Sequence, residues 1–209
     1  MKIISHRGLW YDFEKESNKR IAFERSFDKG LGTETDLRDI CGEIVISHNM
    51  PKGDEMTFRD LLKIVDGRNL PLALNIKADG QCDEIKKILK EFNHTNYFTF
   101  DMSIPDMVVQ MNHGLNVYTG QSDILPQPVL IEKASGVWLD SFNGEWFDEK
   151  VLLSLLEMNK NICIVSADLH KRDVSEQWSK LKSFSCISDK RITLCSDIAE
   201  KAQNFFGEF

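Results

Sequence analysis

Residues 2–30 read KIISHRGLWYDFEKESNKRIAFERSFDKG, and this stretch contains the pattern on which the fold prediction rests. The β-rich run Lys2–Ser5 is followed by apolar side chains at the spacing of one helix face. Gly30 then suits the C-terminal cap, because glycine adopts the left-handed conformation found there. The predicted helix face consists of Ile21, Ala22, Phe23, Ser26 and Phe27. A short strand followed by a helix favours parallel strands joined by crossover helices.

The same alternation recurs along the rest of the chain. The further β-rich runs are Thr33–Leu37, Leu72–Lys77, Tyr97–Asp101, Leu115–Thr119, Gly136–Asp140, Ile162–Ser166 and Ile192–Cys195. An additional run, Glu43–Ser47, comes directly after Gly42 and predicts a hairpin-like excursion at the end of the second strand.

Helical patterns lie between these runs. Thr57 is positioned to open one helix and Gly67 to close it. Apolar stripes fall at Leu61, Leu62 and Val65, at Ile85, Ile88, Leu89 and Phe92, and at Leu152, Leu153, Leu155 and Leu156. Weaker helical patterns cover Asp106–Met111 and Val129–Ala134. Capping-box spacings predict the starts of the last two helices, at Asp173 with Glu176 and at Asp197 with Glu200.

Eight strands and about eight crossovers predict an α/β fold, a single-domain (β/α)8 TIM barrel over residues 1–209. The length lies near the short end of the range for this fold. An open doubly wound sheet is the alternative, and the number of strands favours the barrel. Active sites of barrels lie at the C-terminal ends of the strands, so polar residues there are the candidates for function.

Composition narrows the classes of function. Hydrophobic residues make up 42% and charged residues 28% of the chain, as in soluble globular proteins. A net charge of -7 argues against sequence-independent nucleic-acid binding. The N-terminal apolar run is too short for a signal peptide, and the five cysteines form no C-x-x-C pair. We therefore expect a cytoplasmic protein with reduced thiols, no nucleic-acid partner and no stable membrane insertion; no pattern indicates its oligomeric state.

Two carboxylates share one face of the second strand. Glu34 and Asp36 are two residues apart, so their side chains point the same way. Converging carboxylates repel each other unless a cation lies between them, and a hard divalent ion such as Mg2+ or Ca2+ prefers oxygen ligands. A solvated strand could carry the same pair, so the interpretation depends on what lies at the other strand ends.

Those strand ends are polar as well. The first strand ends in His6-Arg7, the additional run leads to His48, and Asn75 shares a face of the third strand with Lys77. Later strands end at Asp101, Asp140 and Ser166. Each residue alone is compatible with a cap or a loop, and the joint placement is what favours an active site. Two other histidines, His94 and His113, have no such neighbours and are expected at the surface.

The order His6-Arg7, Glu34-Thr35-Asp36 and then His48 resembles the signature of the glycerophosphodiester phosphodiesterases. Asn18, followed by Ala22-Phe23, is similar to an element that this family carries on its first helix. Later segments, among them Val165–His170, resemble a compact cytoplasmic bacterial branch of the family. The resemblance runs along the whole chain.

The resemblance implies a hydrolase of lipid metabolism that cleaves a small phosphodiester to a phosphomonoester and an alcohol. It also implies one divalent cation, Mg2+ or Ca2+, and a small-molecule phosphodiester as the partner. By similarity, His6 and His48 are the catalytic general acid and base, Arg7 and Lys77 bind the phosphate, and Glu34, Asp36 and Asn75 bind the metal.

Two residues depart from the family pattern. Asn75 stands where the family's third strand has a glutamate, and Asn49 stands where an aspartate follows the second histidine. An amide oxygen can coordinate Mg2+ or Ca2+ but brings no charge, so weaker metal binding is expected.

Two alternatives stay open. Asn75 favours a catalytically weakened barrel that binds a phosphorylated ligand. A phospholipase-type lyase acting on a lipid head group would need an apolar surface beside the site, for which Trp10, Tyr11 and Phe13 are the candidates.

Overall fold

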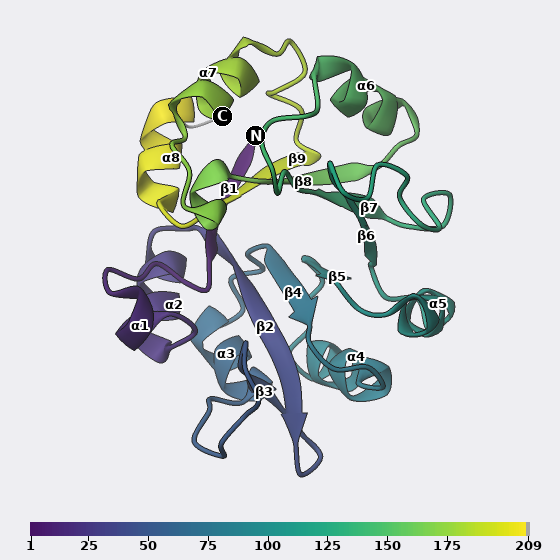
Figure 1. The fold of residues 1–209 in the computed structure, drawn as a ribbon. Helices are drawn as coiled ribbons and strands as arrows, with labels where there is room; N and C mark the ends of the chain where they lie inside the picture. Colours follow the sequence, from purple (N-terminus) through teal and green to yellow (C-terminus); the bar gives the residue numbers. More distant parts are fainter. Residues whose placement is uncertain (208–209) are drawn as a thin grey trace. The chain divides into compact units, whose positions relative to one another are not determined.

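A computed structural model describes residues 1–207. The chain divides into two compact units, one formed by Ser5–Val117 and the other by Met1–Ile4 together with the chain from Tyr118 onward. Strand β1 (Lys2–His6) contributes residues to both units. Figure 1 shows the elements in sequence colours.

The unit Ser5–Val117 continues from β1 with alternating helices and strands. Its elements are α1 (Phe13–Glu16), α2 (Arg20–Asp28), β2 (Gly32–Ile40), β3 (Glu43–Ile46), α3 (Phe58–Val65), β4 (Leu72–Ile76), α4 (Cys82–Glu91), β5 (Tyr97–Phe100) and α5 (Ile104–Asn112). The strand order is β5-β4-β2-β1, and β2, β4 and β5 are parallel. Asp36 on β2 lies beside Asn75 on β4 in this register.

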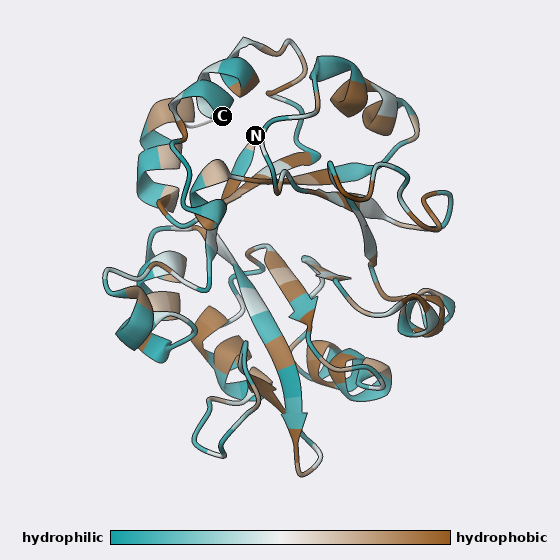
Figure 2. Cartoon of the chain, viewed as in Figure 1, coloured by the Kyte–Doolittle hydropathy of each residue, from teal (hydrophilic) through white to brown (hydrophobic). Residues whose placement is uncertain are grey.

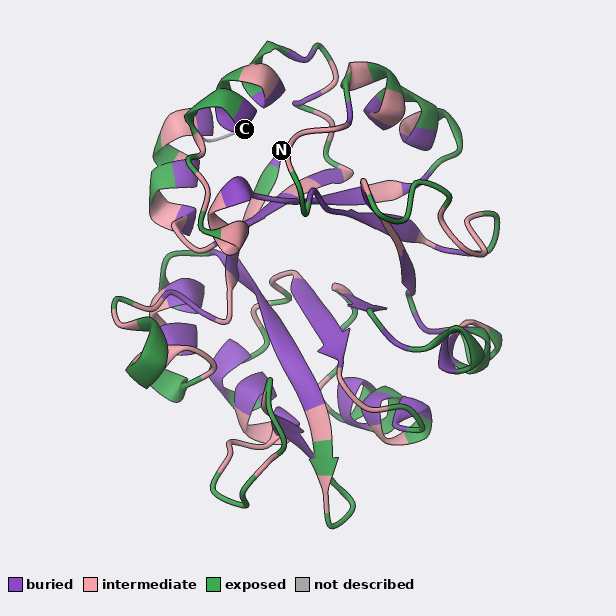
Figure 3. Cartoon of the chain, viewed as in Figure 1, coloured by how far each residue is buried: buried purple, intermediate pink, exposed green. Residues whose placement is uncertain are grey.

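The predicted hairpin after the second strand is confirmed. Strand β3 pairs antiparallel with β2, and Ile40 faces Glu43 across a two-residue turn. Cys41 and Gly42 in that turn have φ of 51° and 84°. Positive φ at both central residues is the requirement of a type I′ turn, which matches the twist of the strands. Figure 3 shows β2 buried over most of its length and exposed at this hairpin end.

Helix α2 packs against the loop that follows β1. A Cβ on Gly8 would lie 2.7 Å from the Cβ of Ala22, and Gly8 has a φ of +82°. Both conditions require glycine at this position. Phe23 and Phe27 of α2 are buried as predicted, whereas Ile21, expected on the same face, is 43% exposed. The chain therefore turns tightly between His6 and α2.

The second unit has the same alternation. Its elements after β1 are β6 (Tyr118–Gln121), β7 (Gly136–Leu139), α6 (Glu149–Glu157), β8 (Asn161–Val165), η1 (Ala167–His170), α7 (Ser175–Ser183), β9 (Ile192–Ser196) and α8 (Ala199–Phe206). The strand order is β1-β9-β8-β7-β6, with β6 to β9 parallel. Helices α6, α7 and α8 cover one face of these strands (Figure 1).

That face forms the apolar core of the second unit. Figure 2 shows apolar residues along β8 and β9. Ile162 and Ile164 of β8 are fully buried and belong to one cluster with Trp178 of α7 and Phe206 of α8. Burying such side chains contributes about 1.5–3 kcal/mol each relative to leaving them exposed. Cys163 and Cys195 are also buried within this unit.

Some local predictions were wrong. Residues 129–133 form turns where Val129–Ala134 had a weak helical pattern, and Leu130 has a φ of 55°, which a right-handed helix cannot contain. The strand predicted at Leu115–Thr119 begins at Tyr118. His94, expected at the surface, is 5% exposed, and burial lowers its pKa.

The capping-box predictions also fail. Helix α7 has Val174 as its N-cap and α8 has Ile198, each one residue after the aspartate expected there. Asp173 instead accepts a hydrogen bond from the backbone N–H of Ser175 at 2.9 Å. Such local bonds compete with capping geometry, so the spacing alone did not fix the helix start.

Within residues 1–207, eight strands, β1, β2 and β4 to β9, alternate with helices, and β3 is the one additional strand. This order is that of the predicted (β/α)8 barrel. Over residues 1–207, every helix is too short or too polar to cross a bilayer.

Candidate active site

The turn after β1 fixes the position of Arg7. Its backbone N–H donates to the Glu34 carbonyl at 3.0 Å, and its carbonyl accepts from the N–H of Asn18 at 3.0 Å. Arg7 and Asn18 both have a φ of 58°. A left-handed conformation costs about 1–2 kcal/mol at a residue with a side chain, so these bonds must hold it. The turn places the Arg7 guanidinium next to β2.

Strand β2 buries two acidic side chains. Glu34 is 1% and Asp36 0% exposed, and the two lie on one face of the strand as expected. Acidic residues are almost never fully buried unless they are paired. This strand is therefore not an ordinary core strand, and the partners of its carboxylates define the site.

Asp36 is surrounded by positive and hydrogen-bonding groups. Its Oδ2 lies 2.9 Å from Nε of Arg7 and accepts from Nδ2 of Asn18 at 2.9 Å. Its Oδ1 lies 3.5 Å from Nζ of Lys77. The hydroxyl of Thr35 in turn donates to Oδ1 of Asn18 at 2.8 Å. These partners compensate for the lost hydration of the Asp36 carboxylate.

Glu34 has weaker partners. Its Oε2 lies 3.6 Å from Nε2 of His6 and has no hydrogen bond to any residue that the structure describes. Burial and the nearby charge of Asp36 raise the pKa of Glu34 to about 7, although the charges of His6, Arg7 and Lys77 oppose this. Oε2 of Glu34 is thus less well compensated than the oxygens of Asp36.

Three buried oxygens in this region have no hydrogen-bond partner among residues 1–207: Oε2 of Glu34, Oδ1 of Asp36 and Oδ1 of Asn75. Buried polar atoms are normally satisfied, so three buried acceptors without a hydrogen bond would suit an additional positively charged group. Carboxylate and amide oxygens are the ligands that Mg2+ and Ca2+ prefer, and the set fits such an ion.

Of the three side chains that carry these oxygens, two are carboxylates, Glu34 and Asp36, and the third is the amide of Asn75. Within the part of the chain that the structure describes, no three His, Cys, Asp or Glu side chains come together as a metal-binding group. The third oxygen comes from the amide of Asn75, which lies beside Asp36 in the register of the strands.

His48 lies where β3 ends. Its Nδ1 is 3.0 Å from Oδ1 of Asn49, and because an amide oxygen only accepts, Nδ1 carries the proton. Nε2 is then the basic nitrogen of the neutral ring. The His48 side chain is exposed and lines a hollow of about 690 Å³ together with Arg7, Asn18 and Phe13.

The aromatic residues after Arg7 divide in their orientation. Trp10 donates from Nε1 to the His6 carbonyl at 3.0 Å and meets Phe13 edge-on at 5.2 Å. The Arg7 guanidinium lies 5.8 Å from the Phe13 ring centroid. Tyr11 is 66% exposed and stacks against Arg25. Trp10 and Phe13 therefore contact the turn at Arg7, although Phe13 is 42% exposed, and Tyr11 lies at the surface.

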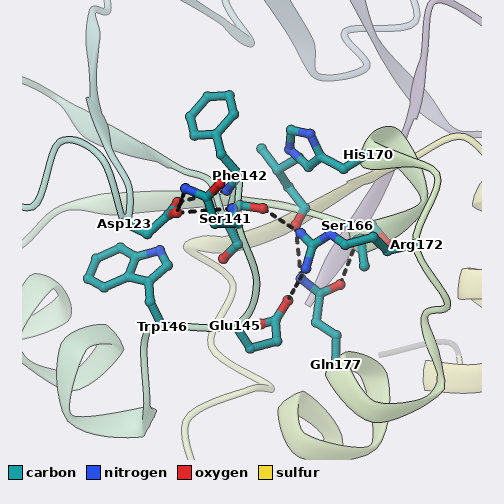
Figure 4. A network of polar contacts seen from close by, with 12 residues as sticks. Asp123, Ser141, Phe142, Glu145, Trp146, Ser166, His170, Arg172 and Gln177 are labelled. Atoms are coloured by element: carbon teal, nitrogen blue, oxygen red, sulfur yellow. Dashed lines mark hydrogen bonds and ion pairs between the residues drawn. The ribbon is translucent and has the colours of Figure 1, made fainter.

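A second polar cluster occupies the other unit (Figure 4). Nε2 of His170 lies 2.7 Å from Oδ1 of Asp140, which also accepts from the N–H of Ser141 at 2.7 Å. Arg172 donates to the Ser141 carbonyl and lies 3.8 Å from Glu145. These contacts tie the loop after β7 to η1 and the residues that follow it. We therefore interpret the cluster as a structural one that holds these loops together.

Only part of this cluster is predictable from the sequence. Asp140 lies at a predicted strand end, but its pairing with His170 joins residues 30 positions apart and leaves no local pattern. Ser166, also at a predicted strand end, accepts a hydrogen bond from Nε1 of Trp178 at 2.9 Å and serves packing. The position of Asp101 beside Asn75 was likewise not anticipated.

No protein-family model matches the sequence, and no curated protein matches it. Solved structures do match. A glycerophosphodiester phosphodiesterase from Parabacteroides distasonis is 14% identical with a TM-score of 0.68, covering 98% of this chain and 96% of that one. The fold is a (β/α)8 barrel.

Two further structures give the same result. A glycerophosphodiester phosphodiesterase from Agrobacterium tumefaciens is 13% identical with a TM-score of 0.69, covering 98% of this chain and 99% of that one. An Oleispira antarctica phosphodiesterase in complex with the product sn-glycerol-3-phosphate is 12% identical with a TM-score of 0.69, covering 98% and 96%. The resemblance inferred from the sequence is confirmed at the level of the fold.

Proposed function

We propose that this chain is a phosphoric diester hydrolase that cleaves a small, glycerophosphodiester-like substrate to a phosphomonoester and an alcohol in the cytoplasm. The observation that carries the proposal is the arrangement around Asp36. Arg7 and Lys77 meet one buried carboxylate beside unpaired oxygens, in a fold shared with phosphodiesterases. Two cationic side chains beside such oxygens suit a phosphate and a metal ion together.

Arg7 and Lys77 would bind the phosphate. Asp36 holds both side chains in place before substrate arrives, with Nε of Arg7 at 2.9 Å and Nζ of Lys77 at 3.5 Å. The Arg7 contact with Asp36 uses Nε. The terminal nitrogens of a guanidinium form a planar fork that matches two phosphate oxygens. Preorganised charge of this kind is a large contribution to phosphoryl transfer.

Glu34, Asp36 and Asn75 would hold one divalent cation, Mg2+ or Ca2+, through the oxygens that lack hydrogen bonds across residues 1–207. When bound there, the cation supplies positive charge that stabilises the phosphoryl oxygens. Arg7 and Lys77 already neutralise part of the negative charge of Asp36. Glu34 would therefore contribute more negative charge to the cation than Asp36 does.

His6 and His48 would divide the two proton transfers. Phosphodiester cleavage requires removal of a proton from the attacking oxygen and delivery of one to the leaving alkoxide, and imidazole suits both tasks near neutral pH. Oε2 of Glu34 lies 3.6 Å from Nε2 of His6, so the carboxyl group is close enough to orient the ring. The hydrogen bond of His48 to Asn49 leaves its Nε2 basic.

The hollow beside Arg7 and His48 suits a small substrate. Its volume of about 690 Å³ is within the usual range for small-molecule sites. Phe13 adds an apolar side chain to its lining, and Lys52 adds a positive charge. The sn-glycerol-3-phosphate bound by the Oleispira antarctica neighbour is a phosphomonoester, the class of product proposed here.

Hydrolysis of a panel of glycerophosphodiesters with Mg2+, Ca2+, Mn2+ or excess EDTA tests the proposal. We expect metal-dependent release of a phosphomonoester, and full activity in EDTA would contradict the metal requirement. A cyclic phosphate product would instead indicate lyase chemistry.

Asn75 is the observation that favours a second function, a binding protein for a phosphorylated ligand, because it removes one charge from the metal site. Saturable binding of sn-glycerol-3-phosphate by a folded protein that turns over no diester with any metal would support that function.

A further inference from the structure

Asn75 makes one hydrogen bond that decides how its amide is turned. The side chain is 7% exposed, and its Nδ2 donates to Oδ2 of Asp101 at 3.1 Å. Its Oδ1 is buried and has no hydrogen-bond partner in the described part of the chain. Asp101 directly follows β5, the strand paired with β4, and its side chain is exposed.

The orientation of the Asn75 amide follows from chemistry. An ionised carboxylate can only accept hydrogen bonds, so the nitrogen end of the amide must face Asp101. The oxygen end then takes the opposite side of the planar group. Asn75 lies beside Asp36 in the parallel register, so both side chains are on the same face of the sheet. Asp101 thus leaves Oδ1 of Asn75 available next to the buried carboxylates.

Asp101 also replaces a charge. Glu34 and Asp36 are the buried acids on β2 at this site, and Arg7 and Lys77 pair with Asp36. An asparagine contributes no charge to a cation, whereas Asp101 brings one within a single hydrogen bond of the amide. Polarisation through such a bond makes the amide oxygen a better ligand.

We infer that Asp101 is a positioning residue for a divalent cation, which orients Oδ1 of Asn75 and supplies the negative charge that a glutamate at position 75 would have brought. The inference rests on the proposed function, since the cation is the one proposed there. Its backbone suits the role, because a φ of 64° is tolerated by aspartate and asparagine better than by other side chains.

Binding of Mn2+ to the full chain, followed by the EPR signal of the free ion, tests this inference without turnover. Asp101→Asn removes the charge and keeps the backbone preference. We expect the Kd for Mn2+ to rise about tenfold or more, as is typical for the loss of a group that orients a metal ligand. Asp101→Gly, which accepts the positive φ, removes charge and acceptor together and should weaken binding further.

Asp66→Asn is the matched control. Asp66 is also exposed, with a φ of 52°, at the C-cap of α3, so the substitution makes the same chemical change in a similar backbone conformation. Its Kd for Mn2+ should equal that of the wild type. Thermal unfolding without metal establishes that each variant is folded.

Asn75→Glu combined with Asp101→Asn provides the rescue. The double variant returns the charge to position 75 and removes the carboxylate that would repel it, so Mn2+ binding should be at least as tight as in the wild type.

The possible outcomes distinguish the role of Asp101 from the proposed hydrolysis. A wild-type Kd in folded Asp101→Asn would overturn the role of Asp101 and leave the proposed hydrolysis standing. Absence of Mn2+ binding by the wild type would overturn both this inference and the metal part of the proposed function. Failure of the double variant to recover affinity would also contradict the inference.

Discussion

At the scale of single residues, the site depends on how Asp36 is compensated. Its carboxylate is fully buried and lies against Arg7, Lys77 and Asn18. Removing one partner of a buried ion pair is far more damaging than removing one at the surface, because the remaining charge stays desolvated.

Arg7→Ala should therefore lower the free energy of unfolding by about 3 kcal/mol, as measured by urea denaturation at pH 7 in EDTA. Arg20→Ala is the control, because Arg20 is exposed and forms an i,i+4 pair with Glu24 at 3.5 Å. Its expected effect is within about 0.5 kcal/mol. Equal losses in the two variants would mean that Asp36 is compensated without Arg7.

Glu34 makes the stability of the metal-free protein depend on pH. Its folded-state pKa of about 7 lies above the usual value of 4.5, so between these values the folded protein keeps a proton that the unfolded chain releases. Stability should fall as pH rises through this window. Glu34→Gln should lack that portion of the pH dependence in urea titrations with EDTA, and parallel curves for wild type and variant would contradict the raised pKa.

The sequence indicated the residues around Asp36 because strand ends and i,i+2 spacing are local properties. It could not show which partner each side chain chooses. Asn18 hydrogen-bonds to both Thr35 and Asp36, and Asn75 hydrogen-bonds to Asp101. These bonds join separate elements, so they depend on the packed structure.

At the scale of elements, the close approach of α2 to the turn after β1 positions Arg7. Gly8→Ala would place a Cβ 2.7 Å from the Cβ of Ala22 in a left-handed conformation. We expect a loss of at least about 2 kcal/mol in the free energy of unfolding, combined with reduced activity, because the turn must shift. Gly30 has a φ of +70°, but a Cβ added there would meet no atom of the described residues within 4 Å. Gly30→Ala should therefore lower the free energy of unfolding by only about 1 kcal/mol. Similar costs at both positions would mean that the α2 contact is not limiting.

Strands and helices with strong periodicity were predicted well, among them β2 with its hairpin and α3 with its Thr57 cap. The failures lie where short patterns compete with local backbone bonds. Leu130, in a left-handed conformation, interrupts the weak helical pattern at residues 129–134, and Val174 takes the cap position predicted for Asp173. The helix pattern at Leu130 and the cap at Val174 are decided by local turns, which the spacing of apolar residues does not reveal.

At the scale of the whole molecule, strand count was sufficient to predict the (β/α)8 barrel, which structures 12–14% identical share. Likeness at that identity establishes the fold, whereas the activity depends on the site. The residues of that site, from His6 to Lys77, all belong to the unit Ser5–Val117. The proposed hydrolysis therefore depends on the side chains of this unit.

The most direct test is 31P NMR of a glycerophosphodiester such as glycerophosphocholine, incubated with Mg2+ or Ca2+ and the wild type, His6→Ala, His48→Ala or His113→Ala. His113 is the control because it is an exposed histidine beside Asp83. The account predicts a phosphomonoester signal with the wild type and His113→Ala, and a rate at least about 100-fold lower for each of the other two variants. Undiminished hydrolysis by folded His6→Ala and His48→Ala would contradict it.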